Sequence, residues 1–112
     1  MKWFFAAVII LHGLIHLMGG VNELGLAKVE GLSGQTLVPI AGYLKSVLGI
    51  LWFLAVVAFL IAGIGLLTNQ TWWKAIAVGA VILSQVLIII WWPAAKFGTV
   101  ANVLVLIGLF LL

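Results

Sequence analysis

The feature that most constrains this chain is a series of long apolar runs separated by short polar connections. About 20 helical residues, each rising about 1.5 Å, cross the hydrocarbon layer of a bilayer, and several of the runs reach that length. Only 6% of the residues are charged, whereas about a quarter are charged in a soluble domain. We therefore predict an integral membrane protein that has the lipid bilayer as its main partner.

The apolar runs predict four transmembrane helices, at about 3–20, 41–67, 74–92 and 97–112. They form one all-α domain, 1–112, in which the helices pack as an antiparallel up-and-down bundle. The connection 21–40 is the longest and most polar segment. Pro39 suits the first turn of the second helix. We therefore expect one membrane domain with a single long connection.

The fourth apolar run is the weakest of the predicted spans. Pro93 ends the third helix, and a helix that began only at Thr99 would be about 21 Å long, which is short of a full span. The sequence then stops at LFLL without a polar flank. Either the last helix is short, or the natural protein continues, for example into a soluble domain.

The lysines do not decide the orientation in the membrane. Four spans place both termini on one side, together with Lys2 and Lys74, whereas Lys28, Lys45 and Lys96 lie on the other side. With the terminal amine, the two sides carry equal numbers of positive groups, so the positive-inside rule gives a tie. Because MKWFF resembles an uncleaved signal anchor, we expect the termini in the cytoplasm.

The polar residues inside the spans predict a binding site. His12 and His16 are four residues apart and share one helix face. An imidazole that faced lipid would leave its N–H group without a partner, so both rings should point into the bundle. Antiparallel packing brings Gln85 and Asn102 to the same half of the membrane, near the connection 21–40. The candidate ligand-binding residues are His12, His16, Glu23, Gln85, Lys96, Thr99 and Asn102.

Several functions are compatible with these residues. The leading prediction is a small non-enzymatic membrane protein that binds a ligand or partner in a polar pocket in this half of the bilayer. A haem-, quinone- or metal-binding redox subunit that uses His12 or His16 is the alternative, and an oligomeric transport or assembly factor is a third. The polar groups could also only hydrogen-bond each other and hold the helices together.

The composition argues against other function classes. His-x-x-x-His can chelate a metal, but such a site needs further ligands, and the only acids are Glu23 and Glu30. Two histidines on one helix cannot enclose one haem, so a haem would need a single histidine or a second subunit, either a copy of this chain or another membrane protein. A Ser-His-Asp triad is impossible without Asp, so no catalytic residues are predicted. Because the positive charges are scattered, nucleic acid is not an expected partner.

Three segments of the chain resemble a group of small bacterial four-helix membrane proteins. They are HGLIHLMG at 12–19, SQVLIIIWW at 84–92 and AKFGTVANVLVLIG at 95–108. The layout is also similar to that of DoxX-like proteins. The resemblance implies a four-helix transmembrane architecture in a bacterial inner membrane. It also places these residues in the group's signature: His12, His16, Lys96, Phe97, Gly98, Thr99 and Asn102. Related proteins often have an acid before AKFG, but this chain has Pro93, Ala94 and Ala95, which weakens any carboxylate-based mechanism.

Overall fold

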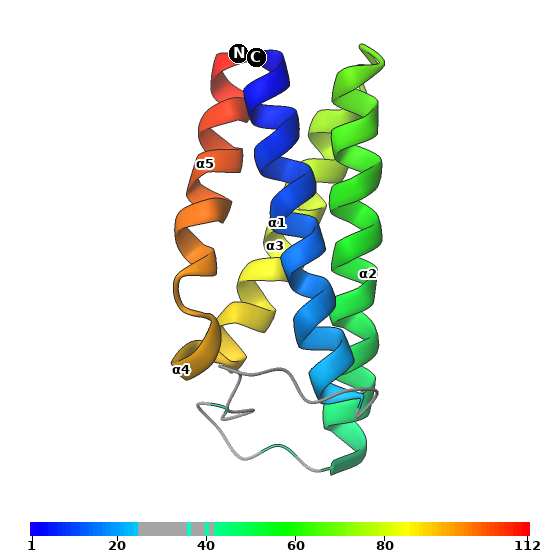
Figure 1. Cartoon of the computed structure of the whole chain (residues 1–112), viewed down its shortest axis with the longest axis vertical. Helices are drawn as coiled ribbons and strands as arrows, with labels where there is room; N and C mark the ends of the chain where they lie inside the picture. The colour runs from blue at the N-terminus through cyan, green and yellow to red at the C-terminus, as the bar shows by residue number, and fades with distance from the viewer. Residues whose placement is uncertain (25–35, 37–39, 41) are drawn as a thin grey trace.

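The computed structural model describes residues 1–24, 36, 40 and 42–112 of the protein. The described residues form helices α1 (Lys2–Glu23), α2 (Gly42–Leu67), α3 (Trp73–Ile90), α4 (Trp92–Ala95) and α5 (Gly98–Leu111). Four of these helices pack side by side, and the short α4 forms the corner between α3 and α5 (Figure 1). The predicted all-α four-helix bundle is confirmed.

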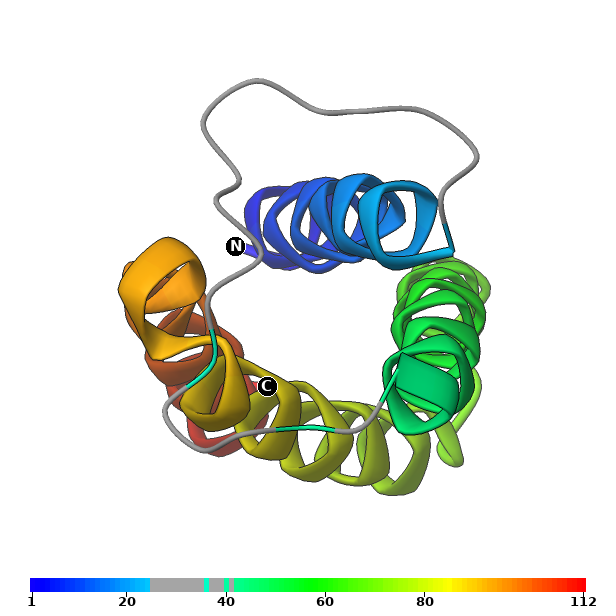
Figure 2. The same cartoon turned by 90° about the horizontal axis from the view of Figure 1, so that it is seen from below.

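The bundle is arranged as a square when it is viewed along its length. Going round the square in Figure 2, α1 lies next to α2, α2 next to α3, and α3 next to α5, which returns to α1. Both chain termini lie at the same end (Figure 1). This end is called the terminal end below, and the opposite end, where α4 lies, is called the α4 end.

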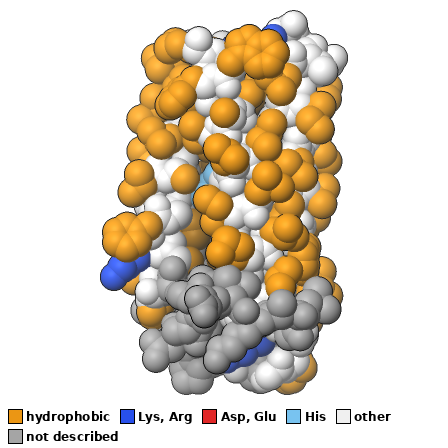
Figure 3. Space-filling view, viewed as in Figure 1, with side chains coloured by type: hydrophobic (Ala, Val, Ile, Leu, Met, Phe, Trp, Pro, Cys, Tyr) orange, Lys and Arg blue, Asp and Glu red, His pale blue; other side chains and the backbone are white. Residues whose placement is uncertain are grey.

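Three helices, α1, α2 and α3, are long and apolar enough to cross a membrane. Helix α5 is equally apolar, but it has only 14 residues. The exposed surface of the bundle carries many large apolar side chains, as expected for helices in contact with lipid (Figure 3). An integral membrane protein is therefore supported by the structure as well as by the composition.

Some helix ends differ from the sequence-based prediction. Helix α1 continues through Glu23 instead of ending at 20, and α3 ends at Ile90 instead of 92. The chain bends after Ile90, and α4 then begins with Trp92 and Pro93. Proline suits this position because the first residues of a helix do not need their N–H groups. Most of the predicted connection 21–40, including Pro39, lies outside the described residues.

Glycines bring α1 and α2 into close contact. A Cβ atom on Gly13 would lie 2.6 Å from Cβ of Phe59, and one on Gly63 would lie 2.5 Å from Cγ1 of Ile10. Both distances are far shorter than a van der Waals contact. Glycines on both α1 and α2 therefore allow close helix packing at this crossing.

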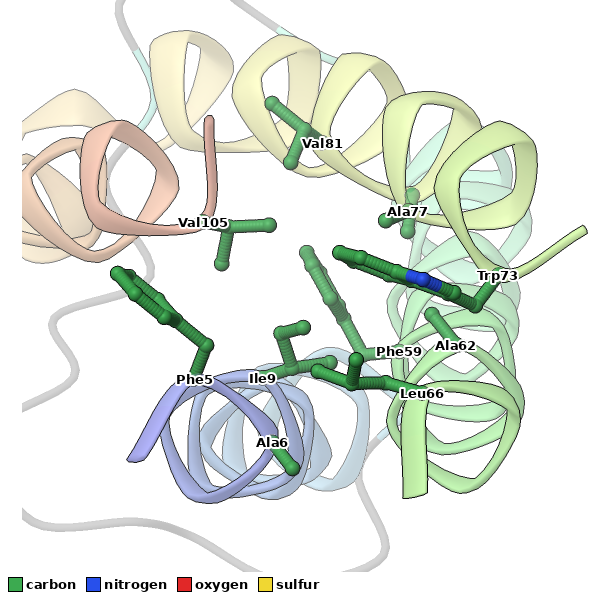
Figure 4. Packing of buried hydrophobic residues seen from close by; sticks show 11 residues of the cluster. Phe5, Ala6, Ile9, Phe59, Ala62, Leu66, Trp73, Ala77, Val81 and Val105 are labelled. Atoms are coloured by element: carbon green, nitrogen blue, oxygen red, sulfur yellow. The ribbon is translucent and has the colours of Figure 1, made fainter. Parts of the chain in front are cut away.

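The terminal half of the bundle is filled by an apolar core. Figure 4 shows side chains from all four long helices meeting there, with Phe5 and Ile9 facing Phe59 and Val105. Phe59, Ile9 and Val105 are almost completely buried. The buried polar side chains of His12, His16, Ser84 and Asn102 lie between this core and the α4 end.

Candidate ligand-binding site

The two histidines lie on the inner face of α1 and are 3% and 2% exposed, for His12 and His16 respectively. Nδ1 of His16 lies 2.7 Å from the carbonyl oxygen of His12. A carbonyl only accepts, so Nδ1 must carry the hydrogen and donate it. Nε2 of His16 is then the acceptor, and it receives the hydroxyl hydrogen of Ser84 across 2.7 Å. This bond links α1 to α3.

Asn102 on α5 is the centre of the polar network. Its Oδ1 accepts a hydrogen bond from Nε2 of His12 at 2.7 Å. Its Nδ2 donates to Oγ of Ser84 and to Oε1 of Gln85, each at 3.1 Å. Nε2 of Gln85 donates in turn to Oγ1 of Thr99 at 3.2 Å. Asn102 therefore connects α1, α3 and α5 through both ends of its amide.

These hydrogen bonds are all satisfied by a single assignment of the protons. Both imidazoles are neutral, with the hydrogen on Nε2 in His12 and on Nδ1 in His16. The two hydrogens of the Asn102 amide go to different acceptors, and the Ser84 hydroxyl both accepts and donates. A buried network in which the donors are matched to acceptors fixes one arrangement of the helices. Nδ1 of His12 is the ring nitrogen that the described hydrogen bonds leave unused.

The structure brings together most of the predicted site residues. His12 and Asn102 are bonded directly, while Gln85 and Thr99 join the network through Asn102. Ser84, which was not among the candidates, is the direct partner of His16. Its position in the middle of an apolar run indicated a buried hydroxyl group. It did not predict a partner on another helix, because a serine hydroxyl can also donate to a backbone carbonyl of its own helix.

Two predicted site residues lie apart from the network. Glu23, in the last turn of α1, accepts a hydrogen bond from Nε1 of Trp91 at 2.8 Å. Lys96 is exposed, and its Nζ lies 5.6 Å from the centre of the Phe97 ring. Glu23 therefore ties α1 to the end of α3, whereas Lys96 faces outward at the corner between α4 and α5.

A cavity of about 310 Å³ lies between the network and the α4 end of the bundle. From the network, His12 and His16 reach its wall, whereas Ser84, Gln85 and Asn102 do not. Most of the other wall residues are apolar or aromatic. The cavity is lined by His12, Ile15, His16, Met18, Gly19, Asn22, Glu23, Trp52, Ile88, Trp91, Ala95, Phe97, Gly98 and Ala101.

The cavity opens sideways, between α1 and α5. Ile15 and Met18 on α1, and Phe97 at the start of α5, line the cavity and are also exposed on the outer surface. Figure 3 shows a histidine side chain at the bottom of the groove between these two helices. The opening therefore faces the side of the bundle that its apolar surface places against lipid.

Trp52 lines the cavity, and its indole N–H is buried without a hydrogen-bond partner among the described residues. Its side chain is only 6% exposed, and its Nε1 is the one buried side-chain nitrogen or oxygen without a hydrogen-bond partner in the described part of the chain. The ring packs against His16 and Trp91, with centroid distances of 5.3 and 5.7 Å. The sequence did not predict that Trp52 lines the cavity, because tryptophans in apolar runs commonly face lipid or pack in the core.

The arrangement does not fit a metal site. Within residues 1–24, 36, 40 and 42–112, no three His, Asp or Glu side chains are close enough to hold one ion together. Both ring nitrogens of His16 and one of His12 are already used in hydrogen bonds. A metal or haem iron would have to rely on Nδ1 of His12 alone, or else break the network.

Comparison with known proteins does not assign a family. No protein-family model, curated protein or solved structure matches this chain. The findings support a four-helix, mostly apolar helical protein with three candidate membrane spans and a buried network of His, Ser and Asn side chains. Its function must therefore be inferred from the geometry of the cavity and the network.

Proposed function

We propose that this chain is an integral membrane protein, with all four long helices crossing the bilayer, that binds a small lipophilic ligand without chemically changing it. Helix α5, with 14 residues, crosses together with the α4 corner. The ligand occupies the cavity beside the histidines. The network holds α1, α3 and α5 in the arrangement that keeps this cavity open.

The observation that carries this proposal is the cavity itself, which lies beside the two histidines and is walled mainly by apolar and aromatic side chains. The cavity volume of about 310 Å³ lies at the lower end of the range for small-molecule sites, roughly 300–1,000 Å³. A small apolar ligand of matching size would therefore fill the cavity.

The position of the opening supports a ligand that comes from the membrane. Ile15, Met18 and Phe97 form an apolar rim between α1 and α5. A molecule dissolved in the hydrocarbon layer would enter without crossing a polar surface. A water-soluble ligand would instead have to lose its hydration to pass this rim.

The Ser84–His16 pair is the strongest argument for an enzyme, and its burial opposes that function. A hydroxyl that donates to a histidine, which is itself oriented by a carbonyl, resembles an activated nucleophile. However, Ser84 is 0% exposed and does not reach the cavity. Its oxygen also accepts a hydrogen bond from Asn102. A substrate in the cavity would not meet this hydroxyl, so the pair is better explained as part of the network.

Filling the cavity tests this function. In lipid nanodiscs that contain ¹⁵N-labelled protein, 4-pentylphenol is expected to shift the backbone amide signals of Gly19 and Gly98 in a saturable way. Ala101→Phe places a ring in the cavity, because Ala101 lines it, and should weaken binding at least tenfold. Val103→Phe adds the same ring to an exposed position on the same helix, and should leave binding unchanged.

Two results would contradict the proposed function. One is a set of shifts that rises linearly with the concentration of 4-pentylphenol, which indicates only partitioning into the bilayer. The other is equal binding by the Ala101→Phe and Val103→Phe proteins, which would place the probe outside the cavity.

A further inference from the structure

Glu23 places a negative charge in the wall of the cavity. It lies in the last turn of α1, and its Oε1 accepts a hydrogen bond of 2.8 Å from Nε1 of Trp91. Both partners of this bond line the cavity. His12 and His16 are almost completely buried, whereas Glu23 is only half-buried. A ligand in the cavity therefore reaches this carboxylate more readily than it reaches the imidazole rings.

The wall offers this carboxylate no positive side chain among the described residues. None of the described residues that line the cavity is a lysine or an arginine. Lys96 is exposed at the corner between α4 and α5, and its Nζ lies 5.6 Å from the centre of the Phe97 ring. A charge beside apolar side chains is costly unless it has a partner of opposite charge. In this cavity the ligand can supply that partner.

Aromatic rings lie next to the carboxylate. Trp91, which donates to Glu23, packs against Trp52 with a centroid distance of 5.7 Å, and both rings line the cavity together with Phe97. The face of an aromatic ring attracts a cation, and a tryptophan ring does so most strongly. The carboxylate at the edge of the Trp91 ring adds to this attraction. An anionic ligand would instead be repelled by Glu23.

The position of Glu23 along the bundle suits an amphiphile. From His16 to Glu23, α1 rises about 10 Å. Because α1 crosses the bilayer, its last turn lies near the membrane surface, where the charged head of an amphiphile is found. The apolar part of such a molecule can enter between α1 and α5, past Ile15 and Met18 at the rim. The charge then does not have to pass through the hydrocarbon layer, where it would be costly.

We propose that the ligand is a lipophilic amine, bound as its ammonium ion, with the positive group at Glu23 and the apolar part between α1 and α5. This inference rests on the proposed function, since it assumes that the cavity binds a ligand. It adds the charge and the chemical class of that ligand. A neutral molecule of similar shape, such as 4-pentylphenol, still fits the cavity but binds more weakly, because it leaves the carboxylate without a positive partner.

A matched pair of probes tests the charge, using the wild-type protein in phosphatidylcholine nanodiscs at neutral pH. 4-Pentylbenzylamine, which is an ammonium ion under these conditions, and 4-pentylbenzyl alcohol have the same ring and chain, and both donate hydrogen bonds. Affinities are measured from backbone amide shifts and compared per mole fraction of probe in the bilayer, because the two molecules partition differently. We expect the ammonium ion to bind about tenfold more tightly, which is the effect of one charge-assisted hydrogen bond.

The variant Glu23→Gln shows whether this preference comes from the carboxylate. Glutamine removes the charge but keeps an oxygen that can accept the Trp91 hydrogen bond. The preference for the ammonium ion should fall to less than about twofold, while the alcohol should bind as it does to the wild type. Lys74→Gln removes a charge at an exposed position at the terminal end, and should leave the preference unchanged.

The carboxyl carbon of Glu23 reports the contact in the wild-type protein. The chain has only two acidic residues, Glu23 and Glu30, so ¹³C-labelled glutamate gives two side-chain carboxyl signals, and Glu23→Gln assigns them. The Glu23 signal should shift in a saturable way with 4-pentylbenzylamine, and much less with 4-pentylbenzyl alcohol.

The outcomes separate the two proposals. Equal or weaker binding of the ammonium ion, compared with the alcohol, would overturn the amine assignment and leave the cavity as a ligand site. A preference that survives Glu23→Gln, or a Glu23 carboxyl signal that does not respond to the amine, would also overturn that assignment. If neither probe nor 4-pentylphenol bound in a saturable way, both proposals would be wrong.

Discussion

Replacement of Asn102 by leucine is expected to lower the free energy of unfolding by about 2–3 kcal/mol. The leucine keeps nearly the same volume but removes three hydrogen bonds, to His12, Ser84 and Gln85. Each such bond contributes about 0.6 kcal/mol on average in membrane proteins. The N–H of His12, left without an acceptor at a buried position, adds about 1 kcal/mol to the loss.

Reversible unfolding in mixed micelles, with increasing dodecyl sulfate and detection by circular dichroism, measures this effect. Val103→Leu is the matched control, because Val103 is the next residue on α5 and faces outward. The control should unfold like the wild type. If Asn102→Leu changed the unfolding free energy by less than about 0.5 kcal/mol, the network would not be what holds α1, α3 and α5 together.

Alanine at Gly13 should destabilise the bundle by about 3 kcal/mol, although it adds one methyl group. That methyl carbon would lie 2.6 Å from Cβ of Phe59. Because this Cβ is attached directly to the backbone, the clash cannot be relieved by a rotation of the side chain. Helices α1 and α2 would have to move apart by about 1 Å, and overpacking of this kind costs roughly 1–3 kcal/mol or more.

Gly79 provides the matched control for this substitution. It lies within α3, where an added Cβ would meet no atom within 4 Å. The Gly79→Ala protein should be as stable as the wild type or slightly more stable, because alanine favours the helix. The same unfolding measurement applies. Similar losses for Gly13→Ala and Gly79→Ala would show that the α1–α2 contact is looser than the structure has it.

The bundle itself could be predicted from the sequence, because lipid imposes strong rules on apolar runs. In lipid, an apolar run forms a helix because a helix pairs all the backbone N–H and C=O groups within the run. Each run was also long enough to be recognised as a separate helix. The ends of the helices were harder to predict. Helix α1 continues to Glu23 because that side chain is tied to Trp91, and a contact between distant residues leaves no local signal.

The polar residues of the site could also be predicted in part, because polar side chains in a membrane-spanning helix face the inside of the bundle. An i, i+4 pair of histidines in a span must face inward, which led to Asn102 and Gln85 as neighbours. The choice of Ser84 as the partner of His16 depends on how the helices are rotated, which polar spacing alone does not determine. Lys96 was among the candidate site residues, but its exposed position at the corner keeps it away from the histidines.

A polar pocket in this half of the bundle was predicted, but the mainly apolar walls of the cavity could not be, because they depend on how distant side chains meet. Trp52 lies in an apolar run, which is typical of a core residue. Whether its N–H finds a partner depends on the positions of α1 and α3, which the sequence does not give. The contrast between the two halves of the bundle is informative. The terminal half is filled by apolar side chains, so the packing provides stability there, and the α4 half has room for a ligand.

Photoaffinity labelling in native membranes tests most directly whether this cavity is a ligand site. A diazirine-bearing 4-alkylphenol is irradiated with the membrane-embedded protein, and the labelled residues are identified by mass spectrometry. We predict that the label falls on residues of the cavity wall, such as Ile15, Met18 and Ala101, and that excess 4-pentylphenol removes it. Labelling mainly at lipid-facing positions such as Val86, without competition, would contradict the account.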